Sequence, residues 1–186
     1  MHPTSAYVHI PFCRHRCGYC NFSLIAGRQE LVAEYLKCLE TELASSLSSP
    51  QTVTTVFIGG GTPTFLQPEQ LMQLLSLVAH WLPLEPGGEF TCEANPLDCT
   101  EQKLSLMQAA GVNRLSLGGQ SFNDRKLKLL ERDHLGAQLR VIIERASNYF
   151  KNLSLDLIFA VPGETLHDWQ TDLESALELP LLHLST

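Results

Sequence analysis

The sequence predicts an α/β fold built from parallel strands, and two observations lead to that prediction. Six short runs rich in β-branched and aromatic residues alternate with segments whose apolar residues recur at helical spacing. Glycines or a Pro-Gly pair follow several of these runs, as expected where a strand passes into a turn. Such alternation favours parallel βα units, in either a doubly wound sheet or a barrel-like arrangement. In both, functional residues gather at the carboxyl ends of the strands.

The six predicted strands are short and evenly distributed. They cover residues 6–10, 53–58, 89–94, 114–117, 153–159 and 181–184. Each is a compact apolar or alternating run, and glycines follow the second and fourth strands directly. The last strand closes the sequence without a following helix, and a parallel strand needs cover on both faces. We therefore expect the chain to be part of a longer protein.

The helices between these strands show an apolar face and recognisable ends. They cover residues 29–47, 68–82, 101–110, 127–130, 137–150 and 166–177. Pro68 suits the first turn of a helix, and Thr100 can cap the next one, which Gly111 is placed to end. Thr165 with Asp168 resembles a capping box. These signals set the expected boundaries of the helices.

Composition excludes several functional classes. The chain has 186 residues, 44% of them hydrophobic and 18% charged, which is typical of a globular domain rather than a disordered one. Its net charge of −7 argues against a general nucleic-acid binder. No apolar run approaches the ~18 residues that a membrane span needs, and the start does not resemble a signal peptide. We expect a single domain over residues 1–186, located in the cytoplasm.

Three cysteines crowd into one segment directly after the first strand. Cys13, Cys17 and Cys20 have the spacing CxxxCxxC, so three thiolates can converge on one centre. Four would close an ordinary iron–sulfur site, whereas three leave one iron of a four-iron cluster without a protein ligand. An open position of this kind is where a substrate or cofactor can bind. Arg14 and Arg16 are expected to place positive charge beside the thiolates and favour their deprotonation.

Other interpretations of the cysteines remain open at this point. A zinc site would need a fourth ligand, which His15 or His9 could supply. A disulfide between cysteines so close in sequence would be strained. The remaining cysteines have no partner spacing, and Cys38, within a predicted helix, is expected to contribute only packing.

The run Tyr7-Val-His-Ile-Pro-Phe-Cys13-x3-Cys17-x-Tyr-Cys20, with Gly59-Gly-Gly-Thr-Pro63, resembles the radical S-adenosylmethionine (radical SAM) superfamily. Within it, the chain is similar to the group containing oxygen-independent coproporphyrinogen III oxidase and the heme chaperone HemW. The resemblance implies a parallel (β/α)6 three-quarter TIM-like barrel, truncated after strand six, without the family's C-terminal domain. It also implies a [4Fe-4S] cluster on the three cysteines. When reduced, that cluster cleaves bound SAM into methionine and a 5′-deoxyadenosyl radical.

The resemblance also implies SAM contacts at positions that have plainer interpretations. The implied contacts are Tyr7, Tyr19, Gly60, Gly61, Thr62, Glu93, Gln120, Arg132 and Asp156. The glycines could form a simple strand-end turn, although their N–H groups are also expected to make an anion-binding concavity. Glu93 could be merely solvated, Tyr19 merely packed, and Asp156 part of a structural ion pair. Arg132 is placed on a helix.

His9 is the one candidate for a catalytic residue, because it shares a face of the first strand with Tyr7. A satisfied core histidine is the equal alternative. Phe22 bears on the branch of the family, since the oxidase carries a cysteine two residues after its third cluster ligand. Phe22 stands at that position, and the oxidase's long N-terminal extension is missing. Both departures favour the HemW-like branch.

The HemW-like branch implies a heme chaperone, with heme bound only in a full-length form that includes the C-terminal domain. The implied partners are a flavodoxin- or ferredoxin-like reductant and a heme acceptor protein, without nucleic acid or a membrane span. Two alternatives remain. One is the coproporphyrinogen III oxidase of porphyrin biosynthesis, whose activity Phe22 puts in doubt. The other is a cluster-carrying electron-transfer module without catalysis.

Overall fold

The computed structural model describes residues 4–186, and its centre is one parallel sheet of six strands. Its strands are β1 (Ser5–Ile10), β4 (Val53–Gly60), β5 (Leu84–Ala94), β6 (Arg114–Gln120), β7 (Asn152–Leu157) and β8 (His183–Ser185). Their order in the sheet, β1-β4-β5-β6-β7-β8, follows the chain without a reversal. A doubly wound sheet reverses its strand order at a switch point. The sheet is therefore of the barrel type, and it confirms the predicted partial (β/α)6 barrel.

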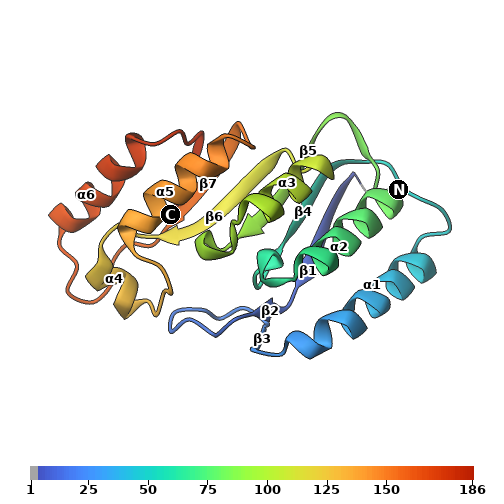
Figure 1. Cartoon of the computed structure of the whole chain (residues 1–186), viewed down its shortest axis with the longest axis horizontal. Helices are drawn as coiled ribbons and strands as arrows, with labels where there is room; N and C mark the ends of the chain where they lie inside the picture. Colours follow the sequence, from blue (N-terminus) through green and yellow to red (C-terminus); the bar gives the residue numbers. More distant parts are fainter. Residues whose placement is uncertain (1–3) are drawn as a thin grey trace.

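Helices connect the strands and lie along one face of the sheet, as Figure 1 shows for the neighbours α1, α2 and α3. The helices are α1 (Val32–Ser46), α2 (Pro68–Trp81), α3 (Glu101–Ala109), α4 (Asp124–Leu129), α5 (Gly136–Ser147) and α6 (Leu166–Leu177). The core lies between the two layers, where Leu115, Leu117 and Leu155 are fully buried. Within residues 4–186, no helix is both long and apolar enough to cross a bilayer.

The predicted helix ends are confirmed. Pro68 occupies the first turn of α2, and the Thr100 side chain accepts the Lys103 N–H at the start of α3. Thr165 and Asp168 form a capping box on α6. Gly111 adopts φ +91°, a left-handed conformation that ends the helix at little cost for a residue without Cβ.

Several boundaries differ from the prediction. Helix α1 is preceded by a 3₁₀ turn, Gln29–Leu31, so the α-helix begins later than residue 29. Strand β7 ends at Leu157, although the Ile158 N–H still donates to the Gln120 carbonyl at 3.0 Å. The last strand is formed by residues 183–185 rather than 181–184. Strand β5 is longer than predicted and begins at Leu84, with a register shift opposite the start of β4.

Two very short strands, β2 (Phe12–Cys13) and β3 (Ile25–Ala26), form a separate parallel ladder that the sequence did not predict. Two residues are too few to show a period of two. The ladder closes the cysteine segment into a loop, since the Gly27 N–H donates to the Cys13 carbonyl at 2.9 Å. The loop lies at the end of the sheet where the strands finish (Figure 1).

The face of the sheet opposite the helices is polar, and this creates the cavity of the molecule. One row of side chains across neighbouring strands is Glu93, Ser116, Ser154 and His183. The next row is Gly118, Asp156 and Ser185. Bulky branched residues normally fill the interior of a parallel barrel. Small and polar residues leave space instead, and they line a cavity of about 450 Å³.

Candidate functional site

This cavity brings together most of the predicted site residues. Its lining includes Cys13, Cys17, Tyr19, Cys20, Gly60, Gly61, Thr62, Glu93, Gln120, Arg132 and Asp156. The cysteine loop, the glycine loop after β4 and the ends of β5, β6 and β7 each contribute to it. Tyr7 and His9 stand beside the cavity but are not part of its lining. The side chain of Tyr7 is 59% exposed and packs against Phe57.

The three clustered cysteines are free thiols held by the loop that β2 and β3 close. Cys13 ends β2 and is buried, with its Sγ 3.3 Å from the Thr62 hydroxyl. Burial raises the pKa of the Cys13 thiol. The Cys20 N–H donates to the Cys17 carbonyl at 3.0 Å, which forms a turn between the second and third cysteine. The disulfide alternative is therefore wrong for this structure.

The geometry argues against the zinc alternative, although the His15 Nε2 lies 3.6 Å from the Cys17 Sγ. Across residues 4–186, no three His, Cys, Asp or Glu side chains are close enough together to hold a single metal ion. Both ring nitrogens of His9 already have partners, the Tyr7 hydroxyl at 3.0 Å and the Ser23 carbonyl at 2.9 Å. The His15 Nε2 lies 2.6 Å from the Glu131 carbonyl. In a four-iron cluster each thiolate binds a different iron, so three separated thiols beside a cavity fit that group.

Both ring nitrogens of His9 are hydrogen-bonded within the protein, which fits a structural histidine rather than a catalytic one. Its ring packs behind Gly60, where an added Cβ would lie 2.4 Å from the His9 Nδ1. Gly60 also has φ +107°, a conformation that favours glycine. A side chain at Gly60 would therefore displace both the turn and the imidazole. The arrangement gives His9 a supporting role under the glycine loop.

The N–H groups of the glycine loop are directed at protein acceptors. The Gly60 N–H donates to the Glu93 carboxylate at 3.0 Å. The N–H groups of Gly61 and Thr62 donate to the carbonyls of Ile10 and Phe12, each at 2.7 Å. The expected anion-binding concavity is therefore wrong at these three positions. These hydrogen bonds fix the loop against the neighbouring strands. They also bring the Thr62 hydroxyl beside the Cys13 thiol.

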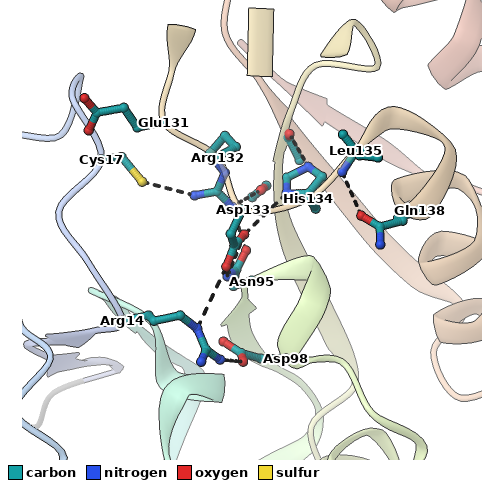
Figure 2. Close-up of polar contacts among 12 residues, drawn as sticks. Arg14, Cys17, Asn95, Asp98, Glu131, Arg132, Asp133, His134, Leu135 and Gln138 are labelled. Carbon is teal, nitrogen blue, oxygen red and sulfur yellow. Dashed lines mark hydrogen bonds and ion pairs between the residues drawn. The ribbon is translucent and has the colours of Figure 1, made fainter. Parts of the chain in front are cut away.

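The positive charge beside the thiols comes from a different arginine than expected. Arg14 donates to Asp98 at 2.8 Å, and Arg16 donates to the carbonyls of the cysteine loop itself. The prediction that these two arginines flank the thiolates is wrong, because nearby carboxylate and carbonyl groups take their N–H groups. Arg132 instead donates from Nη1 to the Cys17 Sγ at 3.5 Å (Figure 2).

Arg132 does not lie on a helix, contrary to the prediction. Helix α4 ends at Leu129 and α5 begins at Gly136, so Arg132 lies in the segment between them. From there its Nη2 donates to the Asn95 Oδ1 and to the Gly118 carbonyl, both at 2.7 Å. This segment places the guanidinium between the carboxyl end of β6 and the cysteine loop.

Two half-buried carboxyl groups face the cavity, Glu93 from β5 and Asp156 from β7. The pKa of Glu93 is raised to about 7, chiefly by its removal from water and also by the nearby Asp156 carboxylate, while the Gly60 N–H lowers it. Burial also raises the pKa of Asp156, which accepts a hydrogen bond from Ser116 at 3.4 Å. Within residues 4–186, Asp156 forms no ion pair, so the structural ion-pair alternative is wrong. Two carboxyls with raised pKa values suit a ligand that carries positive charge, because such a charge would stabilise their ionised forms.

Gln120 has a left-handed backbone conformation that could not be predicted from the sequence. It is buried, adopts φ +69°, and follows a register shift between β6 and β7. A non-glycine residue held in this conformation costs free energy and is enriched at functional sites. The bend turns the Gln120 side chain toward the cavity.

Sequence reasoning missed three residues that hold the arginines around the cysteine loop. Asn95, which lines the cavity, accepts from Arg132, and Asp98 accepts from Arg14, while Asp133 contacts Asn95 and lies 3.9 Å from Arg14. Their only sequence signal is position, since Asn95 follows a strand and Asp133 follows Arg132. Cys38 was also misjudged: it lies on α1 as predicted, but its side chain is exposed rather than packed.

The raised pKa of Glu93 predicts that the free energy of unfolding depends on pH. The folded carboxyl has a pKa of about 7 against an ordinary value of 4.5, so the folded chain binds an extra proton between these values. The contribution of Glu93 to stability therefore falls as the pH rises through this window. Glu93→Gln should remove that fall, which urea unfolding at pH 4, 6 and 8 would measure. Glu89→Gln, on the same strand, is the control, and identical pH profiles for both variants would contradict the prediction.

Comparison with known proteins gives matches over most of the chain. The sequence model of the Radical SAM superfamily matches residues 7–176. The heme chaperone HemW of Bacillus subtilis is 42% identical over 185 residues, which cover 97% of this chain and 49% of that protein. HemW of Escherichia coli is 38% identical over 187 residues, covering 98% of this chain and 50% of that protein. The chain thus spans about half the length of these curated relatives.

Among solved structures, coproporphyrinogen III oxidase (HemN) from Escherichia coli aligns with a TM-score of 0.88 at 30% identity. The alignment covers 99% of this chain and 44% of the oxidase chain. The family match covers most of the sequence, and the fold agrees over nearly all of it. The chain belongs to the radical SAM superfamily.

Proposed function

We propose that residues 1–186 form the radical SAM core of a HemW-like protein, with Cys13, Cys17 and Cys20 holding a [4Fe-4S] cluster. The observation that carries the proposal is the placement of three free thiols and two half-buried carboxyls in one cavity. Family membership implies both the cluster and SAM as cofactors. The thiols, their spacing and the adjoining space fit the cluster, and the carboxyls fit a cationic cofactor beside it.

The bound and reduced cluster would supply one electron for the reductive cleavage of SAM. The residues of the chain itself would bind SAM and orient it. Glu93 and Asp156 offset positive charge on the cofactor, and their burial strengthens that attraction. Arg132, also in the cavity lining, offers a cation for a carboxylate. Tyr19 and Gln120 are proposed as further contacts and as barriers to water.

The heme chaperone activity is proposed for the whole protein, because the chain spans about half of its HemW relatives. Heme binding, a heme acceptor and a flavodoxin- or ferredoxin-like reductant belong to that proposal. Phe22 supports the HemW-like branch, since this exposed apolar side chain lines the cavity where the oxidase branch is expected to carry a cysteine. Phe22 can neither ligate a metal nor donate a hydrogen bond.

Anaerobic reconstitution of the chain with iron and sulfide, followed by SAM and dithionite, tests the proposal. The expected products are 5′-deoxyadenosine and methionine. A cluster that forms without cleaving SAM would favour the electron-transfer module instead. A parallel assay supplies coproporphyrinogen III, and its conversion to protoporphyrinogen IX would overturn the HemW-like assignment in favour of the oxidase.

Glu93→Ala is expected to weaken SAM binding by about tenfold or more. A hydrogen bond to a charged group contributes about 1.5–3 kcal/mol, and about 1.4 kcal/mol corresponds to a factor of ten in affinity. Isothermal titration of the reconstituted protein with SAM measures the change. Glu89→Ala is the matched control, because Glu89 lies on the same strand but outside the cavity lining. Equal affinities in the two variants would remove Glu93 from the site.

A further inference from the structure

A row of hydrogen bonds along the cavity wall ends on a cysteine and includes two residues that the proposed function does not use, Asn95 and Asp133. It links Asp133 to Asn95, Asn95 to Arg132 and Arg132 to Cys17 (Figure 2). The guanidinium reaches the Cys17 Sγ at 3.5 Å through Nη1, while Nη2 is occupied by Asn95 and the Gly118 carbonyl. Arg132 is thus fixed on one side and directed at a sulfur on the other.

The side-chain amide of Asn95 and its backbone N–H all have hydrogen-bond partners. Its Oδ1 accepts from Arg132 at 2.7 Å, its Nδ2 donates to the Asp133 Oδ2 at 3.1 Å, and its backbone N–H donates to Thr64 Oγ1 at 3.0 Å. A guanidinium only donates and a carboxylate only accepts, so these partners fix which way the amide points. Asn95 therefore transmits the position of Asp133 to Arg132 without carrying a charge itself.

Asp133 is anchored by its own surroundings. The neighbouring His134, whose Nδ1 lies 3.7 Å from the Asp133 Oδ1, lowers the pKa of Asp133 to about 2, with smaller contributions from Arg132 and Asn95, so Asp133 carries a negative charge at neutral pH. The buried His134 ring in turn donates from Nε2 to the Gly119 carbonyl at 3.0 Å. Arg14 approaches Asp133 at 3.9 Å from the cysteine loop. The carboxylate thus joins the loop to the end of β6.

We propose that Asn95 and Asp133 are positioning residues that aim Arg132 at Cys17, and that Arg132 thereby raises the reduction potential of the cluster bound there. The inference rests on the proposed function, because it needs Cys17 to be a cluster ligand. Reduction adds a negative charge to a cluster. A nearby cation and an N–H group directed at a ligand sulfur both stabilise that added charge.

The test compares reduction potentials of the reconstituted cluster in variants of the whole chain. Arg132→Gln and Asn95→Ala are each expected to lower the reduced-to-oxidised ratio at a fixed potential by about tenfold, which is about 59 mV for one electron. Asn95→Ala is the sharper variant because it changes no charge. An unchanged potential in Asn95→Ala would overturn its positioning role, and an unchanged potential in both would overturn the whole inference.

Asp133→Ala separates positioning from simple charge. Removal of a negative charge alone would raise the potential, whereas loss of the positioning contact lowers it. A rise would therefore exclude Asp133 from the proposed role. Arg16→Gln is the matched control, because it removes the same charge from an exposed side chain that donates to loop carbonyls rather than to sulfur. It should shift the potential less than Arg132→Gln.

A second measurement applies even where a variant fails to hold the cluster. The Arg132 Nε is buried, so its N–H in ¹⁵N spectra of the cluster-free chain should exchange slowly with water. Asn95→Ala should speed that exchange about tenfold, and unchanged exchange would contradict the positioning role. Failure of the unaltered chain to assemble any cluster would instead refute the proposed function, and this inference with it.

Discussion

Replacement of Cys13, Cys17 or Cys20 by alanine, one at a time, is expected to abolish the iron–sulfur absorbance of the anaerobically reconstituted protein. All three thiols belong to one loop that faces the cavity, and an open-site cluster has only three protein ligands to lose. Iron and sulfide analysis with visible absorbance between about 350 and 450 nm measures the outcome. Far-ultraviolet circular dichroism of each cluster-free variant should remain unchanged, because the loop lies outside the six-stranded sheet.

Cys38→Ala is the matched control for this experiment. Cys38 is an exposed thiol on α1, and its removal should leave the cluster intact. Cys92 and Cys99 are buried, and burial raises the pKa of each thiol strongly, as expected for inert core cysteines. Full absorbance in any one of the three loop variants would remove that cysteine from the site. Loss of absorbance in Cys38→Ala would move the site elsewhere.

The barrel could be predicted only partly from local patterns. Alternating strand and helix signals gave the parallel βα units and most of the helix caps. They could not distinguish a doubly wound sheet from a barrel, because strand order depends on which strands pack together across the whole chain. The observed order, without a reversal, settles that question. The resemblance to a known family had already pointed to the barrel, on evidence that periodicity does not contain.

The cysteine loop shows the limit of reasoning from neighbours in sequence. Spacing alone placed Cys13, Cys17 and Cys20 in one group, and all three line the same cavity. The same reasoning assigned Arg14 and Arg16 as their charge partners, and it was wrong. The arginine that reaches Cys17 is 115 positions away, delivered by the segment between α4 and α5. Contacts made by the fold leave no local signal.

The glycine loop and Gln120 illustrate a second limit. Glycines at residues 59–61 signal a close approach of backbone, but they do not say which groups approach. The structure shows that His9 and the carbonyls of Ile10 and Phe12 lie there, so the N–H groups are not free for an anion. Likewise, nothing in the identity of Gln120 predicts a left-handed backbone. That conformation arises from the register shift between β6 and β7.

A buried ionic cluster supports the bend at Gln120 from the helix side. Lys126 on α4 contacts Glu164 and lies 3.0 Å from Asp172 on α6, and these side chains are 5%, 5% and 2% exposed. Asp172 also accepts from the Ser121 hydroxyl at 2.6 Å and from the Phe122 N–H at 2.7 Å. One lysine thus ties α6 to the segment that immediately follows Gln120. The Trp169 ring, 5.2 Å from the ammonium, adds a cation–π contact.

Lys126→Met is expected to lower the free energy of unfolding by about 3–5 kcal/mol, because removal of one partner leaves buried carboxylates uncompensated. Urea unfolding at neutral pH, followed by circular dichroism, measures this loss. Arg140→Met is the control: its pairing with Glu178 at 3.0 Å is largely exposed, so the loss should stay below about 1 kcal/mol. Asp172 would also lose its fixed position in the lysine variant, so the bend after β6 should loosen and SAM should bind more weakly. If both variants unfold at the same urea concentration, the ionic group of Lys126, Glu164 and Asp172 is not a structural support for the site.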